Sequence, residues 1–228
     1  MPTAIVTGAS RGLGLALADS LADRGWRLVI DARDGAALEQ AAAGLRARTE
    51  VVALAGDVAD PEHREALVGA FGGPLDLLVN NASALGPSPL PPLARHPLDA
   101  LEQVYRVNAI APLALMQAVL PRLAEGARIV NVTSDAAVEP YEGWGGYGSS
   151  KAALEQLTAV FAAEQPALRV YAVDPGDMNT RMHQEAYPGE DISDRPAPSQ
   201  SVPGLLALIE GDLPSGRYSA AALAGARA

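Results

Sequence analysis

The sequence has 228 residues, a mass of 23.5 kDa and a formal charge of −10, from 17 basic and 27 acidic residues. With 49% hydrophobic and 19% charged residues it has the composition of a folded protein, and its length suits one domain with a full core. The absence of cysteine excludes disulfides, thiolate nucleophiles, iron–sulfur ligation and cysteine-ligated zinc. The acidic balance disfavours nucleic acids and anionic membranes as partners.

Targeting segments are not expected in this sequence. Residues 1–8 enter a strand-like run at once, without a cationic segment and a long apolar core, so no signal peptide is expected. No run reaches about 18 uninterrupted apolar residues, which predicts no membrane span. The expectation is a soluble, cytoplasmic protein.

Short β-rich runs alternate along the chain with longer segments of helical period. Strands are predicted at 3–7, 27–32, 51–55, 75–80, 128–133, 169–173 and 217–220. Helices are predicted near 12–24, 34–47, 61–71, 98–123, 148–164 and 201–210, with Asp60 and Pro61 as the N-cap and first residue of the third. This alternation predicts right-handed βαβ units in one α/β domain over residues 1–228, with about seven strands in a doubly wound parallel sheet and helices on both faces.

Two proline-rich stretches interrupt the alternation. Leu85–Pro97 contains five prolines and is predicted to be an irregular loop. Arg181–Ser201 is acidic and long for a connection, so it is either a mobile lid or a disordered surface insertion. Because such loops often border a ligand, residues 181–200 are expected on the substrate side of a site.

A glycine-rich turn follows the first predicted strand, with the sequence Thr7-Gly8-Ala9-Ser10-Arg11-Gly12-Leu13-Gly14. Gly8 permits a tight exit from the strand, Gly12 lets the backbone approach a pyrophosphate, and Gly14 allows the helix to pack closely on the strand. The helix N-terminus offers N–H groups and the positive end of its dipole to the phosphates. Strand, turn and helix in this order predict dinucleotide binding, against the alternative of a purely structural turn.

The spacing of these glycines resembles the short-chain dehydrogenase/reductase family, and further motifs follow in that family's order. They are Asn80-Asn81-Ala82, Asn108, Ser134, the pair Tyr147 and Lys151, and Asp174-Pro175-Gly176. The resemblance covers nearly the whole chain. It implies a Rossmann-type fold, a small-molecule substrate, and interconversion of a carbonyl and a secondary alcohol by hydride transfer with a nicotinamide cofactor. It also implies a homodimer or homotetramer, formed through the helices near 98–123 and 148–164.

The expected catalytic residues are Asn108, Ser134, Tyr147 and Lys151. Tyr147 and Lys151 lie four residues apart on a predicted helix, so they share one face. A nearby ammonium, joined by a cationic nicotinamide, is expected to lower the phenol pKa by ~3 units from about 10, so that Tyr147 exchanges a proton with the substrate oxygen. Ser134 is expected to donate a hydrogen bond to that oxygen. By resemblance, Lys151 also holds the nicotinamide ribose and Asn108 positions a water; alternatively, Asn108 caps a helix break near Pro112.

The cofactor is expected to be NADP, with NAD as the alternative. Family spacing places Ala32, and not Asp31, against the adenosine ribose, while Arg11 and Arg33 can pair with a 2′-phosphate. Alternatively, both arginines are solvated and Asp31 faces the ribose. The full set predicted to bind cofactor is Gly8, Ser10, Arg11, Gly12, Leu13, Gly14, Arg33, Asp57, Val58, Asn80, Ala82, Tyr147, Lys151, Pro175, Gly176 and Thr180.

Some of these residues have structural alternatives. Asp57 with Val58 resembles the family's adenine-contacting pair, but an aspartate here also caps a following helix. Thr180 is expected at the nicotinamide amide by resemblance, or as an N-cap in the 181–201 segment. The family pattern is broken at Ser83, where glycine is usual, and Asp135 adds a carboxylate beside Ser134.

The three histidines suggest no further site. His63, His96 and His183 have no metal-ligand spacing, so no metal is predicted and all three are expected at the surface. A non-catalytic dinucleotide sensor or scaffold remains the alternative function. The retained catalytic set favours the enzyme, because a sensor has no need of it. An epimerase or dehydratase of the longer related branch is disfavoured by the glycine spacing and by the short segment after Ala220.

Overall fold

Seven parallel strands form one sheet in the computed structural model, which describes residues 1–225. The strands are β1 (Thr3–Val6), β2 (Arg27–Ala32), β3 (Val51–Ala55), β4 (Leu75–Asn80), β5 (Leu123–Val132), β6 (Arg169–Asp174) and β7 (Gly216–Ser219). Their order is β3-β2-β1-β4-β5-β6-β7, so the chain reverses its direction of winding between β1 and β4. Ligands of such sheets bind at this reversal, outside the carboxyl ends of the strands.

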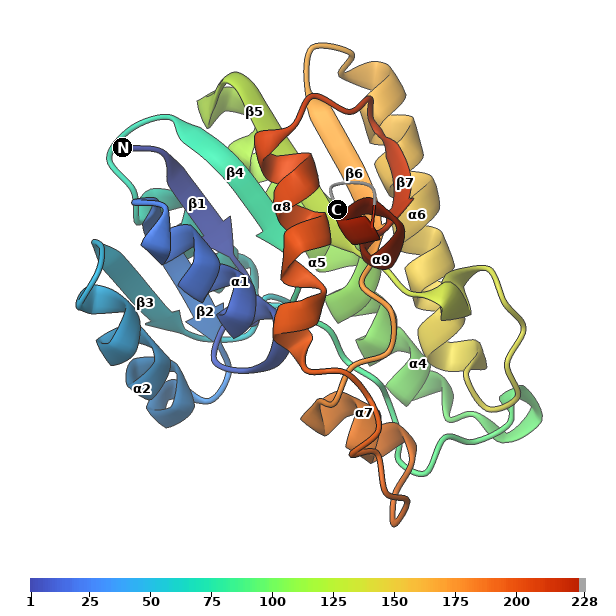
Figure 1. Ribbon diagram of the computed structural model, residues 1–228. Coiled ribbons are helices and arrows are strands. Elements are labelled where there is room, and N and C mark those ends of the chain that lie inside the picture. Colours follow the sequence, from blue (N-terminus) through green and yellow to red (C-terminus); the bar gives the residue numbers. More distant parts are fainter. Residues whose placement is uncertain (226–228) are drawn as a thin grey trace.

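Helices cover both faces of the sheet (Figure 1). They are α1 (Gly12–Asp23), α2 (Gly35–Arg46), α3 (Pro61–Gly69), α4 (Leu98–Tyr105), α5 (Ala111–Val119), α6 (Gly145–Glu164), α7 (Arg181–Ala186), α8 (Val202–Glu210) and α9 (Ala220–Gly225). Helices α1, α2 and α8 pack on one face, while α3, α5 and α6 pack on the other. The predicted cap of α3 is confirmed, because Asp60 accepts a hydrogen bond from the Glu62 amide at 3.0 Å.

The strands contribute alternate residues to two apolar layers. In β1, Ala4 and Val6 join the layer under α1 and α8, whereas Ile5 joins the layer under α3 and α5. All three side chains are fully buried. The doubly wound fold with helices on both faces is therefore confirmed, and burial on both faces explains why these strands read as continuous apolar runs.

The long helix predicted over 98–123 is not continuous. A π-helical segment, Arg106–Ile110, separates α4 from α5, and α5 ends at Val119 before a 3₁₀ turn. Strand β5 begins at Leu123, earlier than predicted, because Leu123 pairs with Leu75 before the register shifts. By length and composition alone, Leu98–Arg122 is apolar enough to cross a membrane, yet half of its most apolar window is buried inside the fold.

The proline-rich stretches differ in structure. Residues 85–97 are irregular as predicted, apart from a 3₁₀ turn at Leu93–Arg95. The 181–201 segment contains the short helix α7, which the sequence analysis did not predict. Thr180 caps this helix by accepting a hydrogen bond from the His183 amide at 3.2 Å. Helix α6 also begins earlier than predicted, at Gly145, so Tyr147 lies in its first turn.

Candidate active site

The glycine turn lies at the carboxyl end of β1, where the winding reverses. Gly8 and Gly12 have φ values of +67° and +59°, which favour glycine. A Cβ on Gly14 would lie 2.5 Å from the Gly8 carbonyl oxygen, so the close packing predicted for Gly14 is present. No side chain in the described residues caps the N-terminus of α1. Its first amides are therefore available to an anion.

Asn81 holds the turn in place from the neighbouring strand. Its amide donates to the carbonyl oxygens of Thr7 at 2.8 Å and Gly8 at 3.1 Å. Asn80, predicted to bind cofactor, instead points into the sheet and donates to Asn131 at 2.7 Å. Asn81 thus lies closer to the turn than Asn80 does. Successive side chains of a strand point to opposite faces, so only one of the two adjacent asparagines can reach the turn, and this alternation is the sequence signal for the role of Asn81.

A cavity of about 1320 Å³ starts at this turn and ends at α7. Most of the predicted cofactor residues line it: Gly8, Ser10, Arg11, Gly12, Leu13, Arg33, Asp57, Val58, Ala82, Tyr147, Lys151, Pro175, Gly176 and Thr180. Asn80, Gly14 and the predicted catalytic residue Asn108 are not in its wall. A volume of this size suits a dinucleotide together with a small substrate.

At the β2 end of the cavity, Asp31 is already engaged. It is 1% exposed, and its two oxygens accept from the Gly8 amide at 2.7 Å and contact His63 Nε2 at 3.0 Å. Arg33 is exposed beside it, and Arg11 forms an ion pair with Asp34 at 3.3 Å. Asp31 lies in the cavity wall, with each oxygen already in contact with a protein group, and the guanidinium groups of Arg11 and Arg33 border the same end of the cavity.

Asp57 and Val58 lie in the wall of the cavity after β3. Asp57 accepts a hydrogen bond from the Ala59 amide at 2.9 Å and so shapes its own turn. The cap of α3 is Asp60, as described above, so the capping alternative for Asp57 is wrong.

Tyr147 and Lys151 project from one face of α6 into the cavity wall. Tyr147 is 8% exposed and Lys151 is 2% exposed, with Lys151 Nζ 5.6 Å from the centroid of the phenol ring. Lys151 donates a hydrogen bond to the Val132 carbonyl oxygen at 2.8 Å. That contact joins α6 to the end of β5. This hydrogen bond was not predicted, because every residue has a backbone carbonyl and the sequence does not show which one a side chain will contact.

Burial favours the neutral forms of Tyr147 and Lys151, and so shifts their pKa values in opposite directions. It lowers the pKa of Lys151 to about 7. It raises the pKa of Tyr147 to about 12; hydrogen bonding to Ser83 and Ser134 opposes this shift, and the charges of Asp135 and Asp174 add to it. In the protein without cofactor the phenol pKa is therefore raised, whereas the lowered pKa was expected with a cationic nicotinamide bound, which stays a prediction. Desolvation is the largest influence on the pKa of Tyr147, and burial also favours the neutral form of Lys151.

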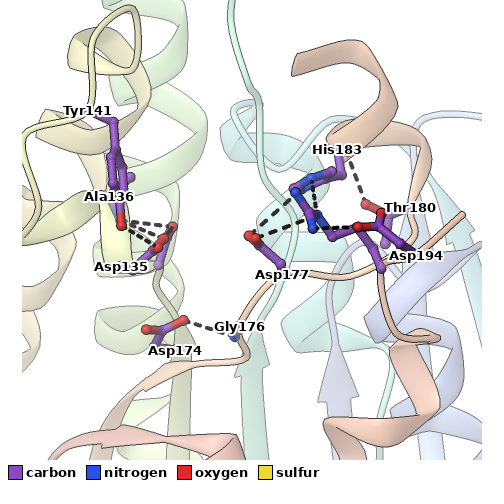
Figure 2. A network of polar contacts seen from close by, with 11 residues as sticks. Asp135, Ala136, Tyr141, Asp174, Gly176, Asp177, Thr180, His183 and Asp194 are labelled. Carbon is purple, nitrogen blue, oxygen red and sulfur yellow. Dashed lines mark hydrogen bonds and ion pairs between the residues drawn. The ribbon is translucent and has the colours of Figure 1, made fainter. Parts of the chain in front are cut away.

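Ser134 lies beside Tyr147 at the end of β5. Its hydroxyl donates to Asp135 Oδ1 at 2.9 Å, and the Tyr141 hydroxyl donates to Asp135 Oδ2 at 3.0 Å (Figure 2). Hydrogen bonding to Asp135 raises the pKa of Tyr141. Ser134 and Asp135 both line the cavity.

Asn108 lies behind the cavity, within the π-helical segment, and is fully buried. Its side chain accepts from the Ala84 amide at 2.7 Å and donates to the Ala84 carbonyl oxygen at 2.9 Å and to Ser150 Oγ at 2.9 Å. Asn108 also accepts from Ser83 Oγ at 3.1 Å, a contact that the sequence analysis did not predict. Ser83 does not have a positive φ, so the serine fits where glycine is usual.

Helix α7 closes the far end of the cavity. Figure 2 shows Asp177 directed toward His183, with a distance of 3.9 Å between Oδ1 and Nδ1. Arg195 donates to His183 Nε2 at 3.4 Å and lies 3.8 Å from Asp177. Thr180 is the N-cap of this helix, as its structural alternative proposed, and its methyl group is 3.7 Å from the position of a Cβ on Gly12. The glycine turn and the start of α7 therefore lie side by side at one edge of the cavity.

An apolar wall borders Tyr147 on the α7 side. The Trp144 ring lies 5.7 Å from the ring of Tyr147 and 6.0 Å from that of Tyr187, and Leu85 and Met182 pack with them. These side chains come from segments that are distant in sequence. They give the cavity an apolar side next to Tyr147.

None of the three histidines is exposed as predicted, and the side chain of His183 is only 10% exposed. His63 and His96 are each 9% exposed and count among the buried residues. His63 is held by Asp31, as described above, and His96 Nε2 lies 2.3 Å from the position that a Cβ on Gly146 would take. Each imidazole fills a space left by a glycine, a pairing that no local pattern reveals.

Known proteins with this arrangement identify the family. A model of the short chain dehydrogenase family matches residues 2–191. The short chain dehydrogenase penD of Penicillium thymicola is 33% identical, covering 93% of this chain and 85% of its own. The crystal structure of a short chain dehydrogenase from Shigella flexneri is 28% identical with a TM-score of 0.86, covering 96% of this chain and 90% of its own. An alcohol dehydrogenase from Thermococcus sibiricus, complexed with 5-hydroxy-NADP, is 28% identical with a TM-score of 0.85 and coverages of 96% and 95%. The chain belongs to the short-chain dehydrogenase/reductase family of oxidoreductases.

Proposed function

We propose that this protein interconverts a carbonyl compound and a secondary alcohol with NADP(H), using Tyr147 as the proton donor and acceptor. The observation that carries the proposal is the continuous cavity that joins the glycine turn to Tyr147, Ser134 and Lys151. A nicotinamide dinucleotide fits its donor groups. The free amides of α1 suit a pyrophosphate, and Gly12, with a φ of +59°, lies in the wall of the cavity. When bound, the nicotinamide supplies or accepts the hydride.

The protein's own residues handle the proton and the substrate oxygen. With a pKa of about 12, Tyr147 is protonated at neutral pH, which is the form that donates a proton to a carbonyl oxygen. Ser134, whose hydroxyl donates to Asp135 in the protein alone, would turn to donate to the same oxygen and stabilise its developing charge. Lys151, with a pKa of about 7, changes charge near neutral pH next to the phenol. The cationic form of Lys151 then favours the phenolate when alcohol is oxidised.

NADP is favoured over NAD because of the groups at the β2 end. Asp31 is buried, with one oxygen held by the Gly8 amide and the other by His63, and Arg33 takes part in none of the ion pairs within residues 1–225. A guanidinium binds a phosphate through charge-assisted hydrogen bonds. The alcohol dehydrogenase relative complexed with 5-hydroxy-NADP supports the same choice.

Calorimetric titration with NADPH and NADH at matched ionic strength tests the cofactor assignment. We expect NADPH to bind more tightly, and Arg33→Ala to weaken NADPH binding by about tenfold while leaving NADH binding unchanged. Arg24→Ala is the matched control, because Arg24 carries the same charge but pairs with Glu210 away from the cavity. Tighter binding of NADH, or equal losses in both variants, contradicts the NADP assignment. Binding of neither dinucleotide contradicts the proposed function.

We also infer that the protein is a homodimer or homotetramer, associated through α5 and α6. Apolar side chains next to and on these helices are exposed, with Ile110 at 55% and Val160 at 44%. Light scattering is expected to give at least twice the 23.5 kDa of one chain. The double variant Ile110→Arg with Val160→Arg is expected to be monomeric, since it places unpaired charges in the interface. A monomeric wild-type protein contradicts the inference.

A further inference from the structure

Asp135 is held rigidly beside the reacting groups. Oδ1 accepts hydrogen bonds from Ser134 Oγ at 2.9 Å and the Ala136 amide at 2.8 Å, while Oδ2 accepts from the Tyr141 hydroxyl at 3.0 Å (Figure 2). A carboxylate has about four acceptor positions, so one position on Oδ2 remains for a further donor. Asp135 lines the same cavity as Ser134 and Tyr147.

The charge of Asp135 is not balanced by a cation of the protein. Asp174 forms an ion pair with Arg217 at 3.5 Å, and Asp177 forms one with Arg195 at 3.8 Å. Among the ion pairs of residues 1–225, none involves Asp135. Its three partners are neutral donors. A partly buried carboxylate without a counter-charge is costly, and a bound cation would offset that cost.

The unbalanced charge also affects both groups that are proposed to handle the substrate oxygen. Because Ser134 donates to Asp135, its hydrogen is directed away from an incoming carbonyl oxygen. The negative charge contributes to the raised pKa of Tyr147. A cation bound at Asp135 would weaken the hold on the Ser134 hydroxyl and cancel the repulsion of the phenolate.

Accepting the proposed hydride transfer, we infer further that the substrate carries an ammonium group on the carbon next to the reacting carbon, and that Asp135 binds this ammonium. Ser134 and Asp135 are adjacent and hydrogen-bonded, so groups bound by each lie on neighbouring substrate atoms. The apolar side formed by Leu85, Trp144 and Tyr187 then takes the remainder of the molecule. The substrate class is the 1,2-amino alcohols and amino ketones with an aryl or alkyl substituent.

Four alcohols that share one phenyl skeleton test this inference. They are 2-amino-1-phenylethanol, 1-phenylethane-1,2-diol, 1-phenylethanol and mandelate, each oxidised with NADP at pH 7, where the amine is protonated. We expect kcat/KM for the amino alcohol to exceed that for 1-phenylethanol by about tenfold or more, with mandelate lowest because its carboxylate faces Asp135.

Two variants separate the charge of Asp135 from its structural contacts. Asp135→Asn keeps an acceptor for Ser134 and Ala136 but removes the charge, so the advantage of the amino alcohol over 1-phenylethanol is expected to disappear. Glu139→Gln removes the same charge from an exposed residue of the same turn that does not line the cavity, and should preserve the advantage. An advantage that persists in Asp135→Asn, or a diol as good as the amino alcohol in the wild-type protein, overturns the inference.

Calorimetry on the NADP-saturated protein distinguishes failure of this inference from failure of the proposed function. Amino-alcohol binding that is about tenfold tighter than that of 1-phenylethanol, and that is lost in Asp135→Asn, supports the inference even if none of the alcohols is oxidised. Turnover of 1-phenylethanol without preferential binding of the amino alcohol supports the proposed function and overturns the inference.

Discussion

Replacing Tyr147 with phenylalanine is expected to lower kcat for carbonyl reduction by about 100- to 10 000-fold, the range typical of general acid–base groups. The substitution removes one hydroxyl that faces Ser83 and Ser134, and the ring keeps its contact with Trp144. Affinity for NADPH is expected to be nearly unchanged, because the glycine turn and the arginines are untouched. Steady-state kinetics and calorimetric titration measure the two quantities separately.

Tyr171→Phe is the matched control for this experiment. Tyr171 is also fully buried, and its hydroxyl donates to the Leu213 carbonyl oxygen at 2.8 Å, but it lies outside the wall of the cavity. Loss of this hydrogen bond in Tyr171→Phe is expected to lower the free energy of unfolding by about 1 kcal/mol and to leave kcat unchanged. A Tyr147→Phe enzyme with near wild-type kcat contradicts the proposed acid–base role. A wild-type protein that binds NADPH but reduces no carbonyl compound favours a non-catalytic sensor.

The fold could be predicted from the sequence because its signals are local. Apolar runs such as Thr3–Val6 are short and flanked by turns, and buried parallel strands have this pattern. The Gly8 and Gly12 positions were predicted from the needs of a tight turn, and both have a positive φ. The Asp60-Pro61 pair correctly marks the start of α3. In each case the neighbouring residues alone determine the conformation.

Predictions failed where a residue's partner comes from a distant segment. His63 was expected at the surface, but it is buried against Asp31, which is 32 positions away in the chain. The direct partners of Asn108, which are Ala84, Ser83 and Ser150, were not predicted either, and its role in positioning a water stays a prediction. The spacing of polar residues in a sequence gives no information on such tertiary contacts.

The charge states of the catalytic pair were also beyond the sequence. The spacing of Tyr147 and Lys151 correctly places both on one face of α6, and it led to the expectation of an ammonium beside a phenolate. It does not show how completely the two groups are buried. Desolvation favours the neutral form of each group, and it is the largest cause of both pKa shifts. The depth of the site, set by β5 and the loop after β4, therefore decides the protonation states.

Lys151→Met is expected to change how stability depends on pH. The pKa of Lys151 is about 7 in the folded protein, against its ordinary value of 10.5. Between these values the unfolded chain binds a proton that the folded chain does not, so the free energy of unfolding rises with pH. The slope from this group approaches about 1.4 kcal/mol per pH unit. Methionine has a similar length and no charge, so the variant should lack this contribution.

Urea denaturation at pH 7, 8 and 9 measures the effect as a difference between the two proteins. The wild-type protein is expected to gain about 2 kcal/mol relative to Lys151→Met between pH 7 and 9, because the slope at pH 7 is only half of its limit. Lys151 is the only lysine in the sequence, so no other lysine titrates in this window, and groups common to both proteins cancel. Lys151→Arg, which keeps a permanent buried charge, should be less stable than Lys151→Met at every pH. Equal pH dependence in the wild-type protein and Lys151→Met would mean that Lys151 is charged in the folded protein at neutral pH, and would restore the ammonium–phenolate pair as the resting state of the site.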